Sequence, residues 1–180
     1  DERYDSAGLV EVLRRHLGDT RLTDATTPVL LTVYDLEARE ALLLRSDDVS
    51  MVDAAHATSA APTYFEPVRL GGRTLIDGGV SLNLPVEVAQ QWGAKRIIAV
   101  DIAAPLKKRD QLTDPFSITD QMVTALMLKE TKRQRERLQN RHGMGDHPHP
   151  VAIPALPKRP RERPHHETRE LPGESHHAEQ

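Results

Sequence analysis

Apolar residues recur along the chain at two spacings, one typical of helices and one typical of strands. Residues 6–17 place leucines at helical spacing and are followed by Gly18, which predicts a helix with a glycine at its end. Residues 51–62 are rich in small side chains and stop at Pro62, which predicts a short, tightly packed helix. A further helix is predicted over residues 85–93, starting at a proline and ending at a glycine.

Four apolar runs are too short for helices and predict strands. Residues 27–36 predict a strand buried on both faces, and residues 40–46 predict its antiparallel neighbour. Residues 68–77 predict a hairpin that turns at Gly71–Gly72, and residues 96–102 predict another buried strand. Helices mixed with strands of this kind indicate an α/β sandwich.

The composition changes near residue 140. Residues 117–140 begin as an amphipathic helix and become a charge-laced one, which predicts a solvated helix. Residues 141–180 hold seven of the 9 histidines and seven of the 13 prolines. Such a segment cannot bury enough apolar surface to offset the entropy of ordering it, so we expect a disordered tail. Loose binding of a transition metal by its histidines is the alternative interpretation. We therefore divide the chain into a folded part, 1–140, and a tail, 141–180.

Charge and composition exclude several classes of function. The formal net charge of −3 is too small to indicate nucleic-acid binding. The chain contains 0 cysteines, which excludes disulfides and thiolate metal sites. Its apolar runs all fall short of the ~20 residues that a membrane-spanning helix needs.

One stretch, RTLIDGGV at residues 73–80, combines features that a surface turn does not explain. Asp77 directly follows Leu75 and Ile76, so a carboxylate ends a buried strand. That arrangement is costly unless the carboxylate is hydrogen-bonded or used in chemistry. An ordinary Asp-Gly turn is the alternative interpretation.

Three motifs in this region resemble a known family. They are S-A-A-P-x-Y-F at residues 59–65, D-G-G at 77–79 and N-x-P at 83–85. Each motif alone is weak, but their order and spacing are similar to those of the second half of a patatin-like phospholipase domain. The resemblance covers about residues 5–105 and implies an α/β/α sandwich, here incomplete at its N-terminus.

The resemblance implies a lipid acyl hydrolase that uses a Ser–Asp dyad without a catalytic histidine. Asp77 would be the base of the dyad, Gly78 and Gly79 would let the backbone turn sharply and approach closely, and Asn83 would cap the following helix and support the site. The implied substrate is a lipid or fatty-acyl ester, and no cofactor or metal is implied. We expect a cytoplasmic protein with peripheral contact to a membrane surface, through residues 107–109 or the basic part of residues 117–140.

The family's nucleophile is missing from the sequence. It lies in a G-x-S-x-G turn, and this motif does not occur in the 180 residues. A glycine-rich segment for an oxyanion hole is also absent from the sequence. We therefore expect the chain to be the C-terminal part of such a domain and to be inactive in hydrolysis by itself.

Other assignments remain open from the sequence. Ser59 could be a nucleophile and His56 a catalytic base, and the alternative for both is a packing role. Tyr64 and Phe65 are expected in the core, and the alternative is that they line an acyl-chain pocket. A magnesium-dependent phosphotransfer enzyme would use the acids that end three predicted strands, Asp35, Asp77 and Asp101. A non-catalytic module that binds lipid or a partner is the third possibility.

Overall fold

The computed structural model describes residues 5–45, 49–102 and 105–141, with side chains as far as Arg137. These ranges contain one four-stranded sheet in the order β2-β1-β4-β3, in which every pair is antiparallel. The strands are β1 (Leu30–Asp35), β2 (Glu40–Arg45), β3 (Val68–Leu70) and β4 (Arg73–Asp77). The expected antiparallel pair and the expected hairpin are confirmed.

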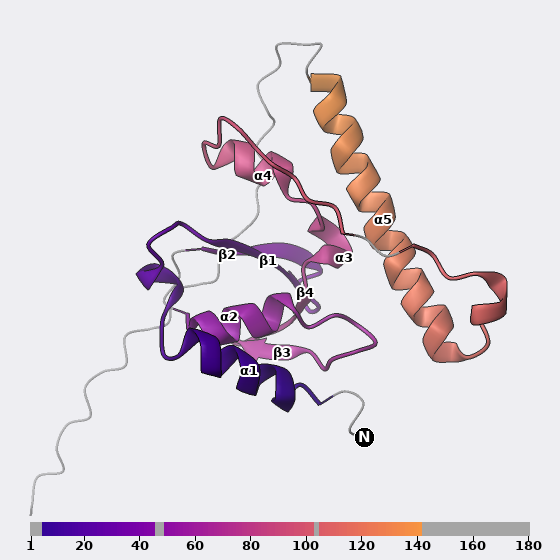
Figure 1. Ribbon diagram of the computed structural model, residues 1–180, viewed down its shortest axis with the longest axis horizontal. Helices are drawn as coiled ribbons and strands as arrows, with labels where there is room; N and C mark the ends of the chain where they lie inside the picture. Colours follow the sequence, from indigo (N-terminus) through magenta and orange to yellow (C-terminus); the bar gives the residue numbers. More distant parts are fainter. Residues whose placement is uncertain (1–4, 46–48, 103–104, 142–180) are drawn as a thin grey trace, which may run out of the picture.

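Within the described residues, five helices accompany the sheet. They are α1 (Ala7–Leu17), α2 (Met51–Thr58), α3 (Gly79–Leu82), α4 (Val86–Gln91) and α5 (Pro115–Arg141), with two short 3-10 turns, η2 (Leu22–Asp24) and η3 (Arg109–Gln111). In Figure 1, α1 and α2 lie on one side of β1 and β2, and α4 lies on the other side. This mixture of helices and sheet confirms the α/β class.

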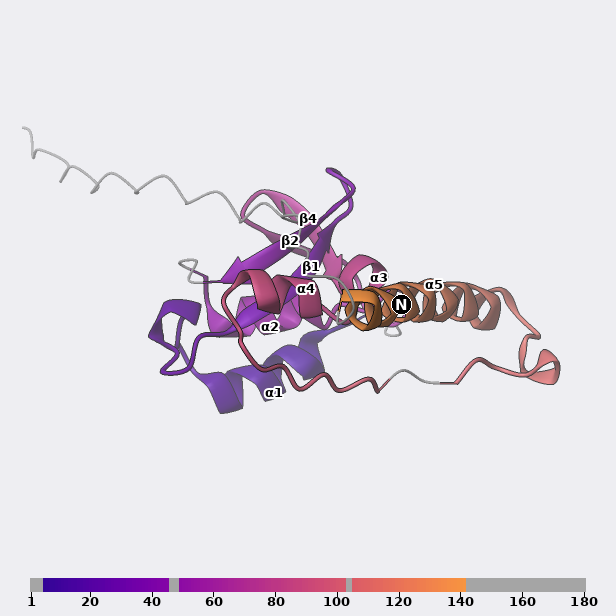
Figure 2. The same ribbon diagram turned by 90° about the horizontal axis from the view of Figure 1, so that it is seen from above.

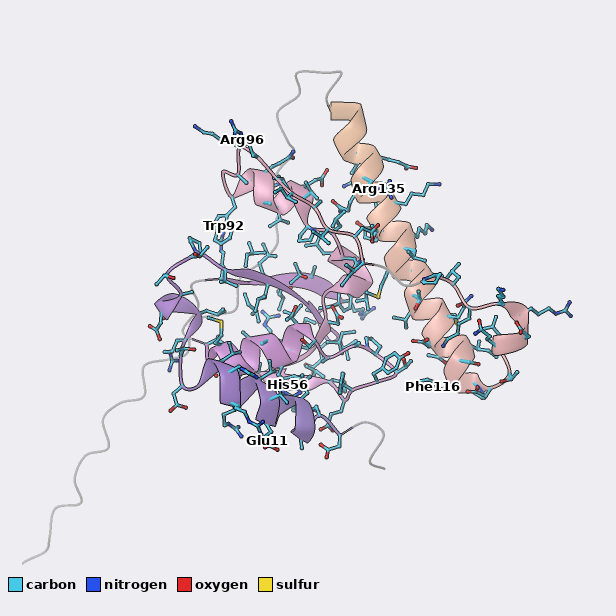
Figure 3. The ribbon with its side chains drawn as sticks, viewed as in Figure 1. Glu11, His56, Trp92, Arg96, Phe116 and Arg135 are labelled. Atoms are coloured by element: carbon cyan, nitrogen blue, oxygen red, sulfur yellow. The ribbon has the colours of Figure 1, made fainter. Side chains whose placement is uncertain are left out.

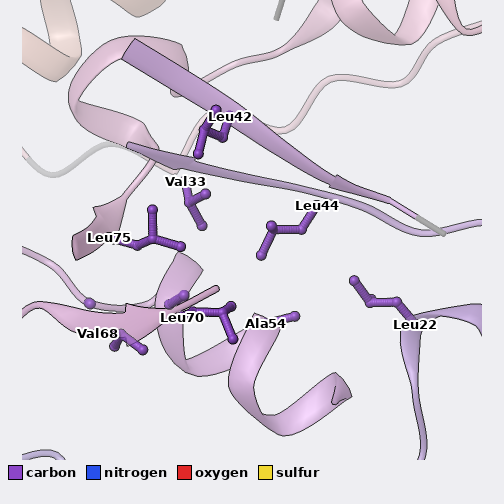
Figure 4. Packing of buried hydrophobic residues seen from close by; sticks show 10 residues of the cluster. Leu22, Val33, Leu42, Leu44, Ala54, Val68, Leu70 and Leu75 are labelled. Atoms are coloured by element: carbon purple, nitrogen blue, oxygen red, sulfur yellow. The ribbon is translucent and has the colours of Figure 1, made fainter. Parts of the chain in front are cut away.

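The two faces of β2 explain the layering. Leu42 and Leu44 point to one face and pack with Ala54 and other residues of α2, as Figure 4 shows. Leu43, between them, points to the opposite face and packs with Leu82 and Val88 of α3 and α4. Because successive side chains of a strand alternate between faces, one apolar run covers both sides of the sheet. The prediction of burial on both faces, made for residues 27–36, is confirmed for the face of β1 that carries Val33 and Asp35, whereas the alternate residues of that strand are half-buried.

The hairpin between β3 and β4 turns at the expected glycines. Gly71 and Gly72 have φ values of 60° and 78°, a left-handed backbone at two consecutive positions. A two-residue turn of this kind matches the twist of the paired strands, and glycine adopts it without steric cost.

The prediction of a buried strand at residues 96–102 is wrong. This segment lies outside the four strands, and Ile98, Val100 and Ile102 are 94%, 70% and 89% exposed. Figure 2 shows it leaving α4 and running outside the sheet. A strand needs a neighbour for its N–H and C=O groups, and none of the four described strands pairs with this segment.

The prediction of a solvated helix at the C-terminal end of the folded part is wrong for one face of α5. Thr131 and Gln134 are buried there, where α5 packs on α3 and α4. The opposite face carries the apolar residues that indicated amphipathicity, Ile118, Met122 and Leu126, and these are about half exposed. None of the described helices is long and apolar enough to cross a membrane. The predicted tail, 141–180, lies outside the described residues except for Arg141 at the end of α5.

Candidate active site around Asp77

Asp77 is the last residue of β4, and its backbone is fixed on two sides. It lies opposite Val33 of β1, and its N–H donates a hydrogen bond to the Ala60 carbonyl oxygen at 3.0 Å. Its carboxyl oxygen Oδ1 accepts a hydrogen bond from the Gly79 N–H at 2.8 Å. Sheet pairing and this local bond together hold the carboxyl group in one orientation at the start of α3.

The two glycines that follow Asp77 lie close to neighbouring elements. A Cβ atom on Gly78 would stand 2.4 Å from the carbonyl carbon of Thr32 in β1, and the φ of Gly78 is −66°. A Cβ atom on Gly79 would stand 2.5 Å from Cε of Met127 in α5. Close approach to the backbone of β1 therefore requires glycine at position 78, where the backbone is not left-handed, whereas the Met127 methyl group beside Gly79 is the end of a flexible side chain.

The environment of Asp77 changes its acidity. Burial raises the pKa of the Asp77 carboxyl above its usual range, and the hydrogen bond from the Gly79 N–H offsets part of this rise. A carboxylate that is partly removed from water is a stronger base than one on the surface. Such a perturbed group at the end of a strand is a candidate for general base chemistry.

Asn83 does not cap α4, so that prediction is wrong. The residue that precedes α4 is Pro85, which has no side chain able to cap it. The amide nitrogen Nδ2 of Asn83 instead donates a hydrogen bond to Oγ1 of Thr131 at 2.8 Å. Its amide oxygen lies on the side of Gly79, 3.0 Å from where a Cβ atom of that residue would be. Asn83 thus joins the Asp77 turn to α5.

Comparison with known proteins identifies this region. The family model of the patatin-like phospholipases matches residues 1–89, which include Asp77, both glycines and Asn83. Residues 1–89 belong to the patatin-like phospholipase family. The helix α5, which contacts the site through Met127 and Thr131, lies beyond the matched residues of the patatin-like model.

Curated patatins match the chain over 116 residues. Patatin group D-2 of Solanum tuberosum and Patatin-17 of Solanum cardiophyllum are 26% identical over 60% of this chain. Patatin-like protein 2 of Oryza sativa subsp. japonica is 34% identical over 55% of this chain. In each case the match spans only 29% or 30% of the length of the relative.

His56 is not paired with Asp77 in this patatin-like chain. Its ring nitrogen Nε2 lies 2.8 Å from Oγ of the buried Ser6, between α2 and α1, where Figure 3 labels it. Burial lowers the pKa of His56, and the charges of Asp53 and Glu66 offset part of this effect. The structure therefore gives His56 a hydrogen-bonding partner just before α1. Ser59 ends α2, and its backbone N–H bonds to carbonyl groups of that helix.

The lowered pKa of His56 predicts a stability change with pH. Because the unfolded chain binds a proton at His56 more readily than the folded chain, the free energy of unfolding falls as the pH drops below about 6.5. A His56→Gln variant keeps a partner for Ser6 but does not titrate. We expect its urea midpoint to fall less than that of the wild type between about pH 7 and pH 5. An equal fall of the urea midpoint with pH in both proteins would contradict this expectation.

The acids that suggested a magnesium site do not converge. In the register of β1 and β4, Asp35 lies opposite Leu75, two residues from Asp77, but its carboxyl is bound by Arg73 and not shared with Asp77. The buried Asp35 forms an ion pair with Arg73 at 2.6 Å, and Asp101 lies 4.0 Å from Arg135 of α5. Within the described ranges, no group of three or more acidic or histidine side chains is placed to hold a metal ion.

The aromatic pair of the 59–65 motif faces outward in part. Tyr64 is about half exposed, which corrects the expectation of a core position, and its ring meets Phe116 of α5 edge-on at 5.6 Å. Phe65 is half-buried. The sequence analysis missed the partners on α5, because an isolated threonine or phenylalanine in a polar helix carries no signal of the element it will contact.

A groove of about 310 Å³ lies between β2, α3, α4 and α5. Two ion pairs border it, Arg137 with Glu87 at 3.2 Å and Arg133 with Glu130 at 3.7 Å. Charged walls of this kind do not suit the hydrocarbon chain of a lipid. The groove is therefore not assigned as an acyl-chain pocket.

Proposed function

We propose that this chain supplies the general base of a lipid acyl hydrolase and that Asp77 is that base. The observation that carries the proposal is the half-buried carboxyl of Asp77, held by the Gly79 N–H in a turn that the family model includes. The proposed substrate is a lipid or fatty-acyl ester. Membership of the patatin-like phospholipase family supports this substrate class.

The proposed reaction uses the two oxygens of Asp77 differently. Oδ1 is held by the Gly79 N–H, so Oδ2 takes the proton from a serine hydroxyl as the serine oxygen attacks the ester carbonyl carbon. The carboxylic acid then returns this proton to the departing alcohol oxygen, which leaves an acyl-serine. Water then attacks the acyl carbon while the same carboxylate takes its proton, the bond from this carbon to the serine oxygen breaks, and the proton passes to the serine oxygen as the fatty acid is released.

We place the nucleophilic serine outside these 180 residues. Support comes from the absence of G-x-S-x-G in the sequence and from the share of the patatins, 29–30% of their length, that the chain matches. The exposed apolar segment 96–102 further supports a missing neighbour, because it has the composition of a buried strand. We propose that this segment pairs with a strand of the nucleophile-bearing part.

The test compares two polypeptides. One consists of these 180 residues, and the other carries the same residues behind their natural preceding sequence. We expect hydrolysis of a short-chain ester by the longer polypeptide alone, and a G-x-S-x-G motif in its added part. Activity of the 180-residue chain, or a folded longer polypeptide without activity or without that motif, would overturn the proposal.

The proposed strand pairing predicts a context-dependent effect of Ile98→Ser. In the 180-residue chain, where Ile98 is exposed, the variant should reduce binding of an apolar dye and leave the urea midpoint unchanged. In the longer polypeptide it should lower the free energy of unfolding by about 2 kcal/mol, the value of burying one such side chain. Val12→Ser on α1, also at an exposed position, is the control and should be neutral in both. Equal behaviour of Ile98→Ser in the two contexts would contradict the pairing.

A further inference from the structure

Thr131 of α5 is a buried hydroxyl whose two hydrogen-bonding roles are both assigned. It is 2% exposed, and its Oγ1–H donates to the Met127 carbonyl oxygen at 3.0 Å. Since its single proton is used in this way, Oγ1 can only accept from Asn83, whose Nδ2 lies 2.8 Å away. Thr131 therefore determines which end of the Asn83 amide points toward α5.

The opposite end of that amide faces the Asp77 turn. The space beside Gly79 is bordered by Oδ1 of Asn83 at 3.0 Å and by Oδ1 of Asp77 at 3.2 Å, both measured from a Cβ atom built on Gly79. The two oxygens thus border the same space beside Gly79, and the Asn83 oxygen cannot donate a hydrogen bond into that space. If the amide were reversed, its NH₂ group would border this space instead, and we expect it to donate a hydrogen bond to the carboxylate there.

The position of α5 is fixed by more than this one hydrogen bond. Met127 packs its Cε against Gly79, one turn before Thr131. Arg137, further along the same helix, forms an ion pair at 3.2 Å with the buried Glu87 of α4. Contacts before and after Thr131 therefore hold its hydroxyl against the Asp77 turn.

We propose that Thr131 is a positioning residue, which keeps the Asn83 amide oxygen toward Asp77 and so prevents the amide from donating a hydrogen bond to the carboxylate. A carboxylate without that bond accepts a proton more readily, because a hydrogen bond to the charged form stabilises it. This inference rests on the proposed role of Asp77 as a base. It gives α5, which lies outside the family match, a part in the site.

The surroundings of Asp77 support this arrangement. In the part of the chain that the structure describes, its pKa is raised by burial and lowered by the Gly79 N–H, without a contribution from a charged side chain. The backbone of Asp77 pairs with Val33 and bonds to Ala60, and the Asn83 amide oxygen lies across Gly79 from its carboxyl. A hydrogen bond from a reversed amide would therefore lower the pKa of the Asp77 carboxyl.

The experiment is a titration of the Asp77 side chain by carbon-13 NMR in the 180-residue chain. Thr131→Val is close in shape but cannot hold the amide, and it should shift the Asp77 midpoint to lower pH. Thr131→Ser keeps both hydrogen-bonding roles and should leave the midpoint unchanged. In an Asn83→Ala background, Thr131→Val should have no further effect, because the effect passes through the Asn83 amide.

Two outcomes would overturn the inference directly. One is an unchanged midpoint in Thr131→Val, and the other is a shift that persists in the Asn83→Ala background. If Thr131→Val does not fold, Thr131→Ala takes its place with the same expectation, and failure of both to fold beside a folded Thr131→Ser would assign Thr131 to stability instead. The titration needs no enzymatic activity, so its result is separate from that of the hydrolysis test of the proposed function.

Discussion

Replacing Asp77 by asparagine in the longer, nucleophile-bearing polypeptide is expected to reduce kcat/KM on a short-chain ester by about 10²–10⁴-fold, the usual contribution of a general base. Asparagine has nearly the same shape and its amide oxygen can still accept the Gly79 N–H, but it cannot take up a proton. The fold should therefore persist while the proton transfer is lost. The measurement is the rate of ester hydrolysis beside a melting curve for each protein.

The same substitution should not destabilise the protein at neutral pH. Because burial raises the pKa of Asp77, the folded state binds a proton there more tightly than the unfolded state does. The ionised carboxylate therefore opposes folding above its folded-state pKa, and this cost disappears as the pH falls toward the unfolded value. We expect Asp77→Asn to be at least as stable as the wild type at pH 7, with the difference shrinking toward about pH 4.

His56→Ala is the control for the Asp77 substitution. The substitution removes the hydrogen bond with Ser6 and should lower the melting temperature. A folded His56→Ala enzyme should keep substantial activity, because the His56 ring bonds to Ser6 and not to Asp77. An active Asp77→Asn enzyme would overturn the proposed base. A folded but inactive His56→Ala enzyme would point to a catalytic histidine instead.

The elements that the sequence analysis predicted correctly are those with local causes. The turn at Gly71–Gly72 follows from the backbone that two glycines permit, and the β1–β2 pair follows from two apolar runs joined by a short turn. The acid at the end of β4 was also evident from the sequence, because a carboxylate after two large apolar residues is unusual. Each of these signals lies within a few residues of the feature that it predicts.

The errors concern contacts between segments far apart in the chain. Residues 96–102 have the composition of a buried strand, but a strand also needs a partner, and composition does not state whether one is present. Asn83 has the position of a helix cap, yet it bonds to Thr131, 48 residues later. One polar face of α5 is buried although its charges predicted solvation, because Thr131 bonds to Asn83 at the end of α3 and the Gln134 amide nitrogen bonds to Glu130 within the helix.

Gly78→Ala is expected to cause a large loss of stability. A Cβ atom at this position would lie 2.4 Å from a backbone carbon and 2.5 Å from a backbone oxygen of Thr32. Backbone atoms of a central strand cannot move aside as the end of a flexible side chain can, so β1 and the end of β4 would have to separate. We expect the free energy of unfolding to fall by about 3 kcal/mol, the upper part of the range for overpacking a core.

Gly8→Ala is the matched control for this prediction, since it adds the same methyl group at a place where space is open. A Cβ atom on Gly8, in α1, would have no neighbour within 4 Å. Alanine favours a helix over glycine, so this variant should gain about 0.5–1 kcal/mol. Urea unfolding followed by circular dichroism measures both variants. A loss of stability in Gly78→Ala beside a gain in Gly8→Ala would show that close approach to β1 requires glycine at position 78. A Gly78→Ala protein as stable as the wild type would refute the packing described for the Asp77 turn.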